Sequence, residues 1–207
     1  YNYILEQSKN FSQEALNRHA ATMRMRGRPK VVLARTYEEA QKLYDKYSDN
    51  TLGVISDARF PLKSAAKAFG NEVMPEEKPK HRTDTFGREK CPDAGLQLFR
   101  YIRKNDPFVP LIIESSESEN RAKAEAEGFR FVDKNSKKMS VDLRRLMEEH
   151  MGFGDFIFRD PKTHEEIMRI HSLKELQDNI FNIPNDSMLY HISRNHMSRW
   201  LCARAIF

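Results

Sequence analysis

Three side chains that could handle a phosphoryl group each come directly after a short apolar run in this sequence. Asp57 follows "GVIS", Ser115 follows "LIIE" and Lys134 follows "FVD". A carboxylate can attack phosphorus as a nucleophile, a hydroxyl can hydrogen-bond a phosphoryl oxygen, and an ammonium group can neutralise developing charge. These residue types would make a coherent phosphate site if the fold brings them to one place.

The segments around these residues alternate between strand and helix patterns. Strands are predicted at residues 31–35, 52–56, 109–115 and 129–133, and helices at residues 1–25, 36–47, 94–104, 117–128 and 141–151. Near-continuous apolar strands that alternate with helices are typical of a parallel sheet covered on both faces. Residues 1–150 are therefore predicted to form an α/β doubly wound domain, in which ligands bind beyond the carboxyl ends of the strands.

The spacing around these residues resembles the receiver domain of two-component response regulators. Asp57 is followed four residues later by Pro61, Ser115 comes five places after Pro110, and Lys134 ends the last predicted strand. The resemblance implies a flavodoxin-like fold and formation of an acyl phosphate on Asp57, assisted by Mg²⁺. It also implies that Ser115 and Lys134 are the switch and charge-binding residues. Asn135 departs from the pattern, because receivers usually have proline there.

The metal site is where the sequence departs most from a receiver. Receivers hold Mg²⁺ with an acidic pair that ends the first strand, together with the acceptor aspartate, since this small cation needs several oxygen ligands. Here the segment before "VVLAR" is the predicted helix of residues 1–25. We expect the first strand and its acids to lie upstream of Tyr1, so that Asp57 binds Mg²⁺ only if that pair exists. The alternative is "YNYIL" as the strand, with Glu6 as the only acid nearby.

The chain also resembles, over nearly its whole length, the N-terminal receiver-like region of bacterial proteins related to phosphoenolpyruvate synthase and pyruvate phosphate dikinase. The resemblance rests on "RMRGRPKVVLARTYEEA", "LGVISDARFP", "VDKNSKKMSVDLRR", "GFGDFIFRDPKTHEEI" and "LYHISRNHMSRWLCAR". It implies that this chain is a regulatory module and not itself an enzyme, so no catalytic residue is assigned to it. The partners implied are a downstream enzyme of that type in the same polypeptide and a histidine kinase.

Residues 151–207 read as a smaller appendage that is cut at its C-terminal end. "GDFIFRD" and "HEEIMRI" predict a β-hairpin, Ser172 with Glu175 begins a helix, and "NDS" begins the last helix. Its apolar residues are expected to pack against the receiver-like core or the neighbouring enzyme rather than to line a cofactor pocket. They are Phe153, Phe156, Phe158, Tyr190, Trp200 and Leu201.

Residues 62–92 form a long polar stretch with little periodicity, directly after Asp57. Such a stretch within a domain is usually functional or a surface insertion. A mobile surface insertion is the favoured interpretation, and a segment that shields or gates Asp57 is the alternative.

Composition restricts the class of protein. The chain has 207 residues, 39% of them hydrophobic, with no apolar run long enough for a membrane span and two widely separated cysteines. These features favour a soluble protein of the cytoplasm. A net charge of +5 arises from 35 basic residues mixed with 30 acidic ones, which is typical of a solvated surface rather than of a nucleic-acid footprint.

Two alternative functions stay open. The first is a degenerate receiver that is never phosphorylated and serves only in protein contact. The second is DNA binding through "RGRPK" (Arg26–Lys30), the core of an AT-hook, although a helix stop followed by a turn is favoured there. The histidines are expected to be solvent-facing or hydrogen-bonded and not to bind metal.

Overall fold

The computed structural model describes residue 6, residues 29–62 and residues 90–204. The helix predicted over residues 1–25, most of Arg26–Lys30 and nearly all of the polar stretch therefore lie outside the described residues. The chain divides into two compact units, one formed by Val32–Ser136 and the other containing Lys137–Phe207. Each unit is described by itself below.

The first unit is built on a parallel three-stranded sheet. Its strands are β1 (Val54–Asp57), β4 (Leu111–Ser115) and β5 (Arg130–Asp133), in the order β1-β4-β5. Helix α4 (Ala94–Asn105) precedes β4, and helix α5 (Glu119–Ala126) connects β4 to β5. The predicted α/β class is confirmed, with a parallel sheet whose strands are joined through helices.

Helix α3 (Tyr37–Tyr47) begins at the predicted capping box. The Thr36 hydroxyl accepts a hydrogen bond from the Glu39 backbone N–H at 3.2 Å, and the Glu39 carboxylate accepts one from the Arg35 N–H at 2.8 Å. This reciprocal pair satisfies backbone donors that have no partner inside the helix. A single 3₁₀ turn, η1 (Ser48–Asn50), follows the helix before β1.

The prediction of a strand over Val31–Arg35 is wrong. No strand is formed there, and Val31, Val32 and Leu33 are 52%, 58% and 70% exposed. β-branched residues only favour positions on a pleated, half-buried surface, and they do not form a strand by themselves. A strand also needs a neighbouring strand, and none of the described residues pairs with this segment.

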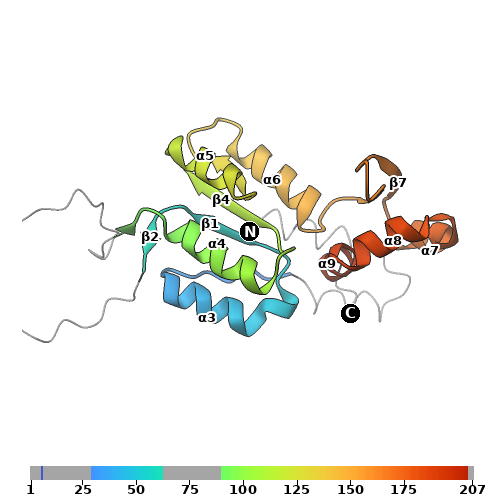
Figure 1. Ribbon diagram of the computed structural model, residues 1–207, viewed down its shortest axis with the longest axis horizontal. Helices are drawn as coiled ribbons and strands as arrows, with labels where there is room; N and C mark the ends of the chain where they lie inside the picture. The colour runs from blue at the N-terminus through green and yellow to red at the C-terminus, as the bar shows by residue number, and fades with distance from the viewer. Residues whose placement is uncertain (1–5, 7–28, 63–89, 205–207) are drawn as a thin grey trace, which may run out of the picture. The chain divides into compact units, whose positions relative to one another are not determined.

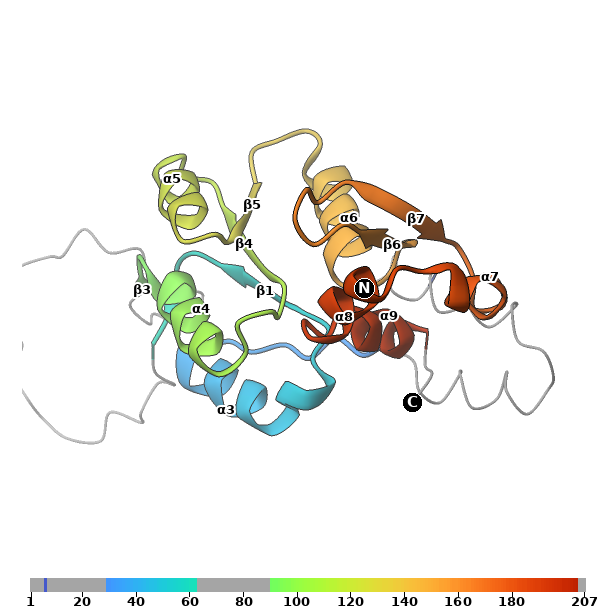
Figure 2. The same ribbon diagram turned by 45° about the vertical axis from the view of Figure 1, so that its right-hand side comes forward.

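One core lies between the sheet and helices α3 and α4. Helix α4 packs against β4 and against α3 (Figures 1 and 2). The Phe99 ring is fully buried and meets the edge of Phe129 at 5.3 Å between centroids. Burial of one such side chain contributes about 1.5–3 kcal/mol, so this core fixes α4 on the sheet. Its other buried members include Tyr44, Leu96, Leu98, Ile102, Val109, Leu111, Ile113 and Ala124.

The ends of the long polar stretch lie next to each other. Strand β2 (Phe60–Pro61) pairs antiparallel with β3 (Lys90–Cys91), so that Phe60 is opposite Cys91. Two-residue strands carry too little pattern to be predicted from sequence. The pairing means that the stretch leaves and rejoins the unit at one place, close after Asp57 in the chain.

The second unit contains the predicted hairpin. Helix α6 (Met139–His150) is followed by β6 (Phe156–Arg159) and β7 (Glu166–Ile170), which pair antiparallel. Helix α7 (Leu173–Asn179) then begins at Ser172, whose hydroxyl accepts the Glu175 N–H as predicted, and leads into the 3₁₀ turn η2 (Ile180–Asn182). The predicted domain boundary after residue 150 falls at the end of α6, whereas the two compact units separate at Ser136.

The last predicted helix is two helices. Helix α8 (Asn185–Ile192) stops before α9 (His196–Ala203), and Asn195 between them has φ of 57°. Asparagine tolerates this left-handed conformation better than most residues, which lets the chain turn sharply.

The apolar residues of the appendage form a core of the unit itself. Phe156, Phe158 and Trp200 are buried together with Ile170, Leu176 and Ile183. The Trp200 indole N–H donates to the Gly154 carbonyl at 3.0 Å, which ties α9 to the segment before β6. The expectation that these side chains cover another domain is therefore corrected for Phe156, Phe158 and Trp200, because they are already buried within this unit.

Candidate functional site

The carboxyl ends of the three parallel strands bring the predicted residues to one edge of the sheet. Asp57 ends β1, Ser115 ends β4 and Lys134 directly follows β5. Because the strands are parallel, these ends share one edge of the sheet, where ligands bind in such folds. The Lys134 backbone N–H donates to the Ser115 carbonyl at 2.9 Å, which fixes the start of the loop after β5.

Asp57 and Lys134 form an ion pair. The Lys134 ammonium donates to the Asp57 Oδ1 atom. The side chains are 49% exposed for Asp57 and 34% exposed for Lys134. The carboxylate is therefore open to solvent, and a cation already stands against it.

Ser115 lies deeper than the ion pair. Ser115 is only 7% exposed. Its Oγ atom accepts hydrogen bonds from the Glu117 backbone N–H at 3.1 Å and from Asn120 Nδ2 at 2.9 Å. Asn120 was not singled out by the sequence, since an asparagine five residues after a serine is not a recognisable motif.

Glu114 is a second carboxylate at the site that sequence reasoning missed. It is the register partner of Asp57 on the neighbouring strand, so both side chains lie on the same face of the sheet. Burial raises the pKa of the Glu114 carboxyl, the charge of Asp57 raises it further, and Lys134 opposes the shift. It was overlooked because it reads as the last residue of an apolar run.

Gly95 lets the first turn of α4 lie close to the backbone at Asp57 and Ala58. Its N–H donates to the Ala58 carbonyl at 3.0 Å, and a Cβ atom at this position would lie 2.4 Å from the Asp57 backbone oxygen. Any side chain would therefore push the first turn of α4 away from the loop that follows Asp57. The sequence shows this glycine only as one residue of a helix.

Asn135, where receivers usually have proline, has a role of its own in the loop. Its side-chain Nδ2 donates to the Ser116 carbonyl at 2.9 Å. This bond connects the loop after β5 to the loop after β4, beside Ser115 and Lys134.

The described residues place two carboxylates at the strand ends, which is fewer than the acidic pair and acceptor aspartate expected for the magnesium site of a receiver. Mg²⁺ prefers six oxygen ligands at about 2.0 to 2.1 Å, of which a protein usually supplies one or two carboxylates while water supplies several of the rest. In the described part of the chain no three acidic, histidine or cysteine side chains come together as a metal site would require. The two carboxylates present, Asp57 and Glu114, share their surroundings with the Lys134 ammonium, which competes with a cation.

The histidines include one hydrogen-bonded pair, in which His191 is buried and His196 is partly buried. His191 Nε2 accepts the Arg159 backbone N–H at 3.0 Å, and its Nδ1 lies 3.0 Å from Nδ1 of His196. Because Nε2 is an acceptor, Nδ1 of a neutral His191 carries the hydrogen and donates to His196. For these two residues the expectation of hydrogen-bonded histidines is met, within the core of the second unit.

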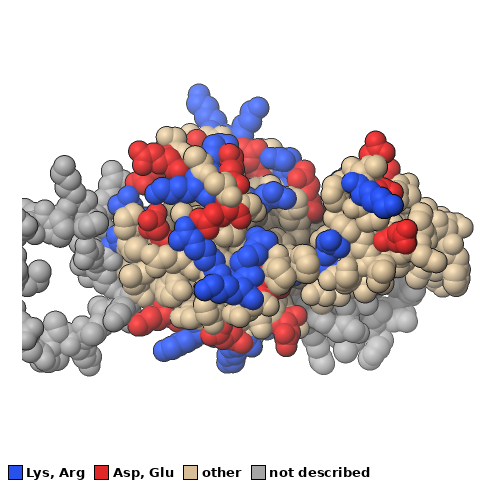
Figure 3. Space-filling model, viewed as in Figure 1, with Lys and Arg blue, Asp and Glu red and all other residues tan. Residues whose placement is uncertain are grey.

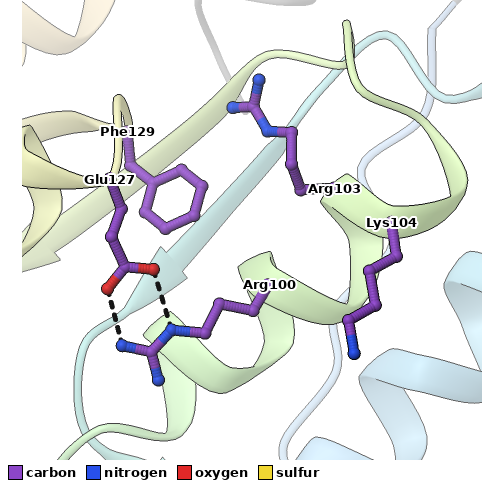
Figure 4. Close-up of a pocket in the computed structure, with 5 residues that line it drawn as sticks. All are labelled: Arg100, Arg103, Lys104, Glu127 and Phe129. Atoms are coloured by element: carbon purple, nitrogen blue, oxygen red, sulfur yellow. Dashed lines mark hydrogen bonds and ion pairs between the residues drawn. The ribbon is translucent and has the colours of Figure 1, made fainter.

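A shallow hollow on the first unit lies away from these residues. It is lined by Arg100, Arg103, Lys104, Glu127 and Phe129. Figure 4 shows the three basic side chains pointing in different directions, with Arg100 paired to Glu127. Since their charges do not converge on one point, the hollow is a weaker candidate than the strand ends.

Comparison of the chain with protein-family models, with curated proteins and with solved structures gives no match. Among the described residues, no helix is both long enough and apolar enough to cross a membrane.

Proposed function

We propose that this chain is a regulatory receiver-like module of flavodoxin-like topology, with Asp57 as its phosphoacceptor. The single observation that carries the proposal is the exposed Asp57 carboxylate paired with Lys134 at the carboxyl edge of a parallel sheet. The buried Ser115 hydroxyl at the same edge supports it. Lys134 reaches Asp57 from β5, which is two places away in the sheet. Such a contact between the ends of separate strands supports a shared site more than it supports a simple strand end.

The step proposed is the transfer of a phosphoryl group from an acyl phosphate or a phosphohistidine. One Asp57 carboxylate oxygen attacks phosphorus, a new P–O bond forms, and the bond from phosphorus to the leaving group breaks. The leaving group departs with the bonding electrons as acetate, when acetyl phosphate is the donor. Lys134 then exchanges its bond to the Asp57 carboxylate for one to the added phosphoryl oxygens, so its charge stays neutralised.

The proposed role in the cell is control of a neighbouring enzyme. The resemblance to the N-terminal region of phosphoenolpyruvate synthase-like proteins supports a downstream enzyme of that type in the same polypeptide, and a histidine kinase as the phosphoryl source. Phosphorylation would change the contacts of the loops after β4 and β5, where Ser116 and Asn135 already bond to each other.

A second candidate is a module that makes protein contacts without ever being phosphorylated. It is favoured by two observations: the Lys134 ammonium already bonds to the Asp57 carboxylate, and no cluster of three metal-ligating side chains lies among the described residues. In that case the ion pair is a structural element of the sheet edge.

Acetyl phosphate distinguishes the two candidates. The 207-residue chain is incubated with acetyl phosphate, with and without MgCl₂, and its intact mass is measured. The proposal predicts the addition of one phosphoryl group to the wild type and none to Asp57→Asn. Asp178→Asn is a matched control, because Asp178 is also an exposed aspartate paired with a lysine, Lys174, at 2.7 Å. No mass increase in any of the three proteins would overturn the phosphoacceptor proposal and leave the contact module, and an equal increase in all three would overturn the assignment to Asp57.

A further inference from the structure

The Ser115 hydroxyl has both of its acceptor positions filled. A hydroxyl offers one donor hydrogen and two acceptor lone pairs. The Glu117 backbone N–H and the Asn120 amide both donate to Ser115 Oγ, at 3.1 and 2.9 Å. The remaining hydrogen-bonding capacity of this buried hydroxyl is therefore its hydrogen, which it can only donate.

The orientation of Asn120 is fixed by its second bond. Its Nδ2 also donates to Glu117 Oε2 at 3.2 Å, and a carboxylate oxygen can only accept. The nitrogen, and not the oxygen, of the amide must therefore face both Glu117 and Ser115. Asn120 is 4% exposed and lies in the first turn of α5, where its backbone N–H donates to the Glu117 carbonyl at 3.2 Å.

Glu117 is held in turn from the loop after β1. The Arg59 Nη2 atom donates to Glu117 Oε1 at 3.0 Å and to Oε2 at 3.2 Å. Arg59 comes two residues after Asp57 in the chain. A continuous series of bonds therefore runs from beside Asp57 through Arg59, Glu117 and Asn120 to Ser115.

We propose that Asn120 is a positioning residue that makes the Ser115 hydroxyl a hydrogen-bond donor toward a phosphoryl group on Asp57. This inference rests on the proposed function. The oxygens of an ionised phosphoryl group accept hydrogen bonds, so a hydroxyl must present its hydrogen to stabilise them. By donating to Oγ, Asn120 keeps the lone pairs occupied and the hydrogen available, and it acts only through Ser115.

The sharpest variant is Asn120→Asp, which keeps the size and shape of the side chain but replaces the donor with an acceptor. The new carboxylate would take the Ser115 hydrogen for itself. The initial rate of phosphorylation by acetyl phosphate is expected to fall about ten- to a hundredfold, as the loss of a hydrogen bond to a charged group predicts. Asn120→Ala, which only removes the donor, is expected to lower the rate less, because the hydroxyl can then rotate.

A double-mutant cycle separates positioning from a general effect on structure. In a Ser115→Ala background, Asn120→Asp is expected to cause no further loss of rate, since the residue through which it acts is gone. Asn179→Asp is the matched control: the Asn179 amide also donates at 2.9 Å, to the Glu175 carbonyl in the second unit, and its loss should leave the rate unchanged.

The outcomes distinguish this inference from the proposed function. Phosphorylation of the wild type at Asp57 with an unchanged rate for Asn120→Asp would overturn the inference alone. Additive losses in the double mutant would overturn it as well, because Asn120 would then act independently of Ser115. A wild type that takes up no phosphoryl group would overturn the proposed function and the inference with it. Should Asn120→Asp fail to fold, as judged by circular dichroism, the same comparisons are made with Asn120→Ala.

Discussion

At the scale of single residues, the ion pair between Lys134 and Asp57 is expected to contribute little to the stability of the fold. An exposed ion pair contributes about 0 to 1 kcal/mol to folding, because water screens the charges and both side chains lose freedom. Both side chains here are open to solvent. The arrangement therefore matters chiefly through the charge that it places next to the carboxylate.

Replacement of Lys134 by methionine is expected to impair phosphorylation while sparing the fold. Without the ammonium, the charge developing on the phosphoryl group is no longer neutralised, and the rate with acetyl phosphate should fall on the order of 10²-fold. The free energy of unfolding in urea should change by less than about 1 kcal/mol.

The matched control for this variant is Lys174→Met, which removes the lysine of another exposed aspartate pair. It should match the wild type in rate. A Lys134→Met rate equal to that of the control would contradict the assigned role of Lys134.

The positions of Asp57, Ser115 and Lys134 could be predicted because each follows an apolar run, and a parallel sheet aligns such ends. Glu114 and Asn120 could not, for different reasons. The side chain of Glu114 reaches the site because the pleat places it on the face of Asp57, and the sequence does not reveal strand register. Asn120 acts by a side-chain contact across a loop, which has no spacing rule.

At the scale of elements, the approach of α4 to the loop after β1 depends on Gly95. Gly95→Ala would place a Cβ atom 2.4 Å from the Asp57 carbonyl oxygen and 3.1 Å from the Ala58 Cα atom. Both obstacles are backbone atoms, so the helix or the loop must move, and the free energy of unfolding should fall by about 1–3 kcal/mol. Phosphorylation of Asp57 should slow as well, because the loop that directly follows it is displaced.

Gly128→Asn is the comparison for this variant. Gly128 has φ of 73°, which asparagine tolerates, and no atom lies within 4 Å of a Cβ placed there. The midpoint of urea denaturation should fall less than for Gly95→Ala, because only the backbone conformation opposes the new side chain, and the phosphorylation rate should stay near the wild-type value. A Gly95→Ala protein as stable as Gly128→Asn would show that α4 does not press on the Asp57 loop.

Helix starts that are marked by a nearby capping residue were predicted correctly. A strand that needs a partner elsewhere in the chain was not. Thr36 and Ser172 begin helices through capping bonds that lie within four residues of sequence. Residues 31–35 have strand composition but no partner among the described strands. The break at Asn195 arises from a backbone conformation that helix periodicity does not reveal.

At the scale of the whole molecule, basic and acidic residues are nearly balanced, with 35 of one kind and 30 of the other. Figure 3 shows lysine and arginine side chains mixed with aspartate and glutamate side chains over the face seen there of the first unit. Some basic side chains of the first unit form ion pairs with acids, as Arg100 does with Glu127 and Lys123 with Asp93. Composition alone predicted such a mixed surface, because the 35 basic residues are interleaved with 30 acidic ones.

The stability of the second unit is expected to fall in acid. Burial, reinforced by neighbouring positive charges, lowers the pKa of His191 and of His196 from 6.5 to about 4. As the pH falls, the histidines of the unfolded chain therefore bind protons before those of the folded chain do. The free energy of unfolding that is present above pH 6.5 is lost as the pH falls toward 4. Since His196 is only partly buried and water screens it, the expected loss is roughly 1–2 kcal/mol per histidine.

Trp200 makes this loss measurable. It is the only tryptophan and is 1% exposed in the core of the second unit, so its fluorescence follows the unfolding of that unit. Urea denaturation at pH 7 and at pH 4.5 should give different midpoints for the wild type. The difference should shrink in a protein carrying His191→Gln and His196→Gln, and an unchanged difference would assign the acid sensitivity to other groups.

Chemical mapping of the modified residue would show directly whether Asp57 accepts a phosphoryl group. After incubation with acetyl phosphate, borohydride reduction converts a phosphorylated aspartate to homoserine, which peptide mass mapping then locates. Homoserine is expected at position 57 and at no other aspartate of the chain. An unmodified Asp57, or homoserine at a different position, would contradict it.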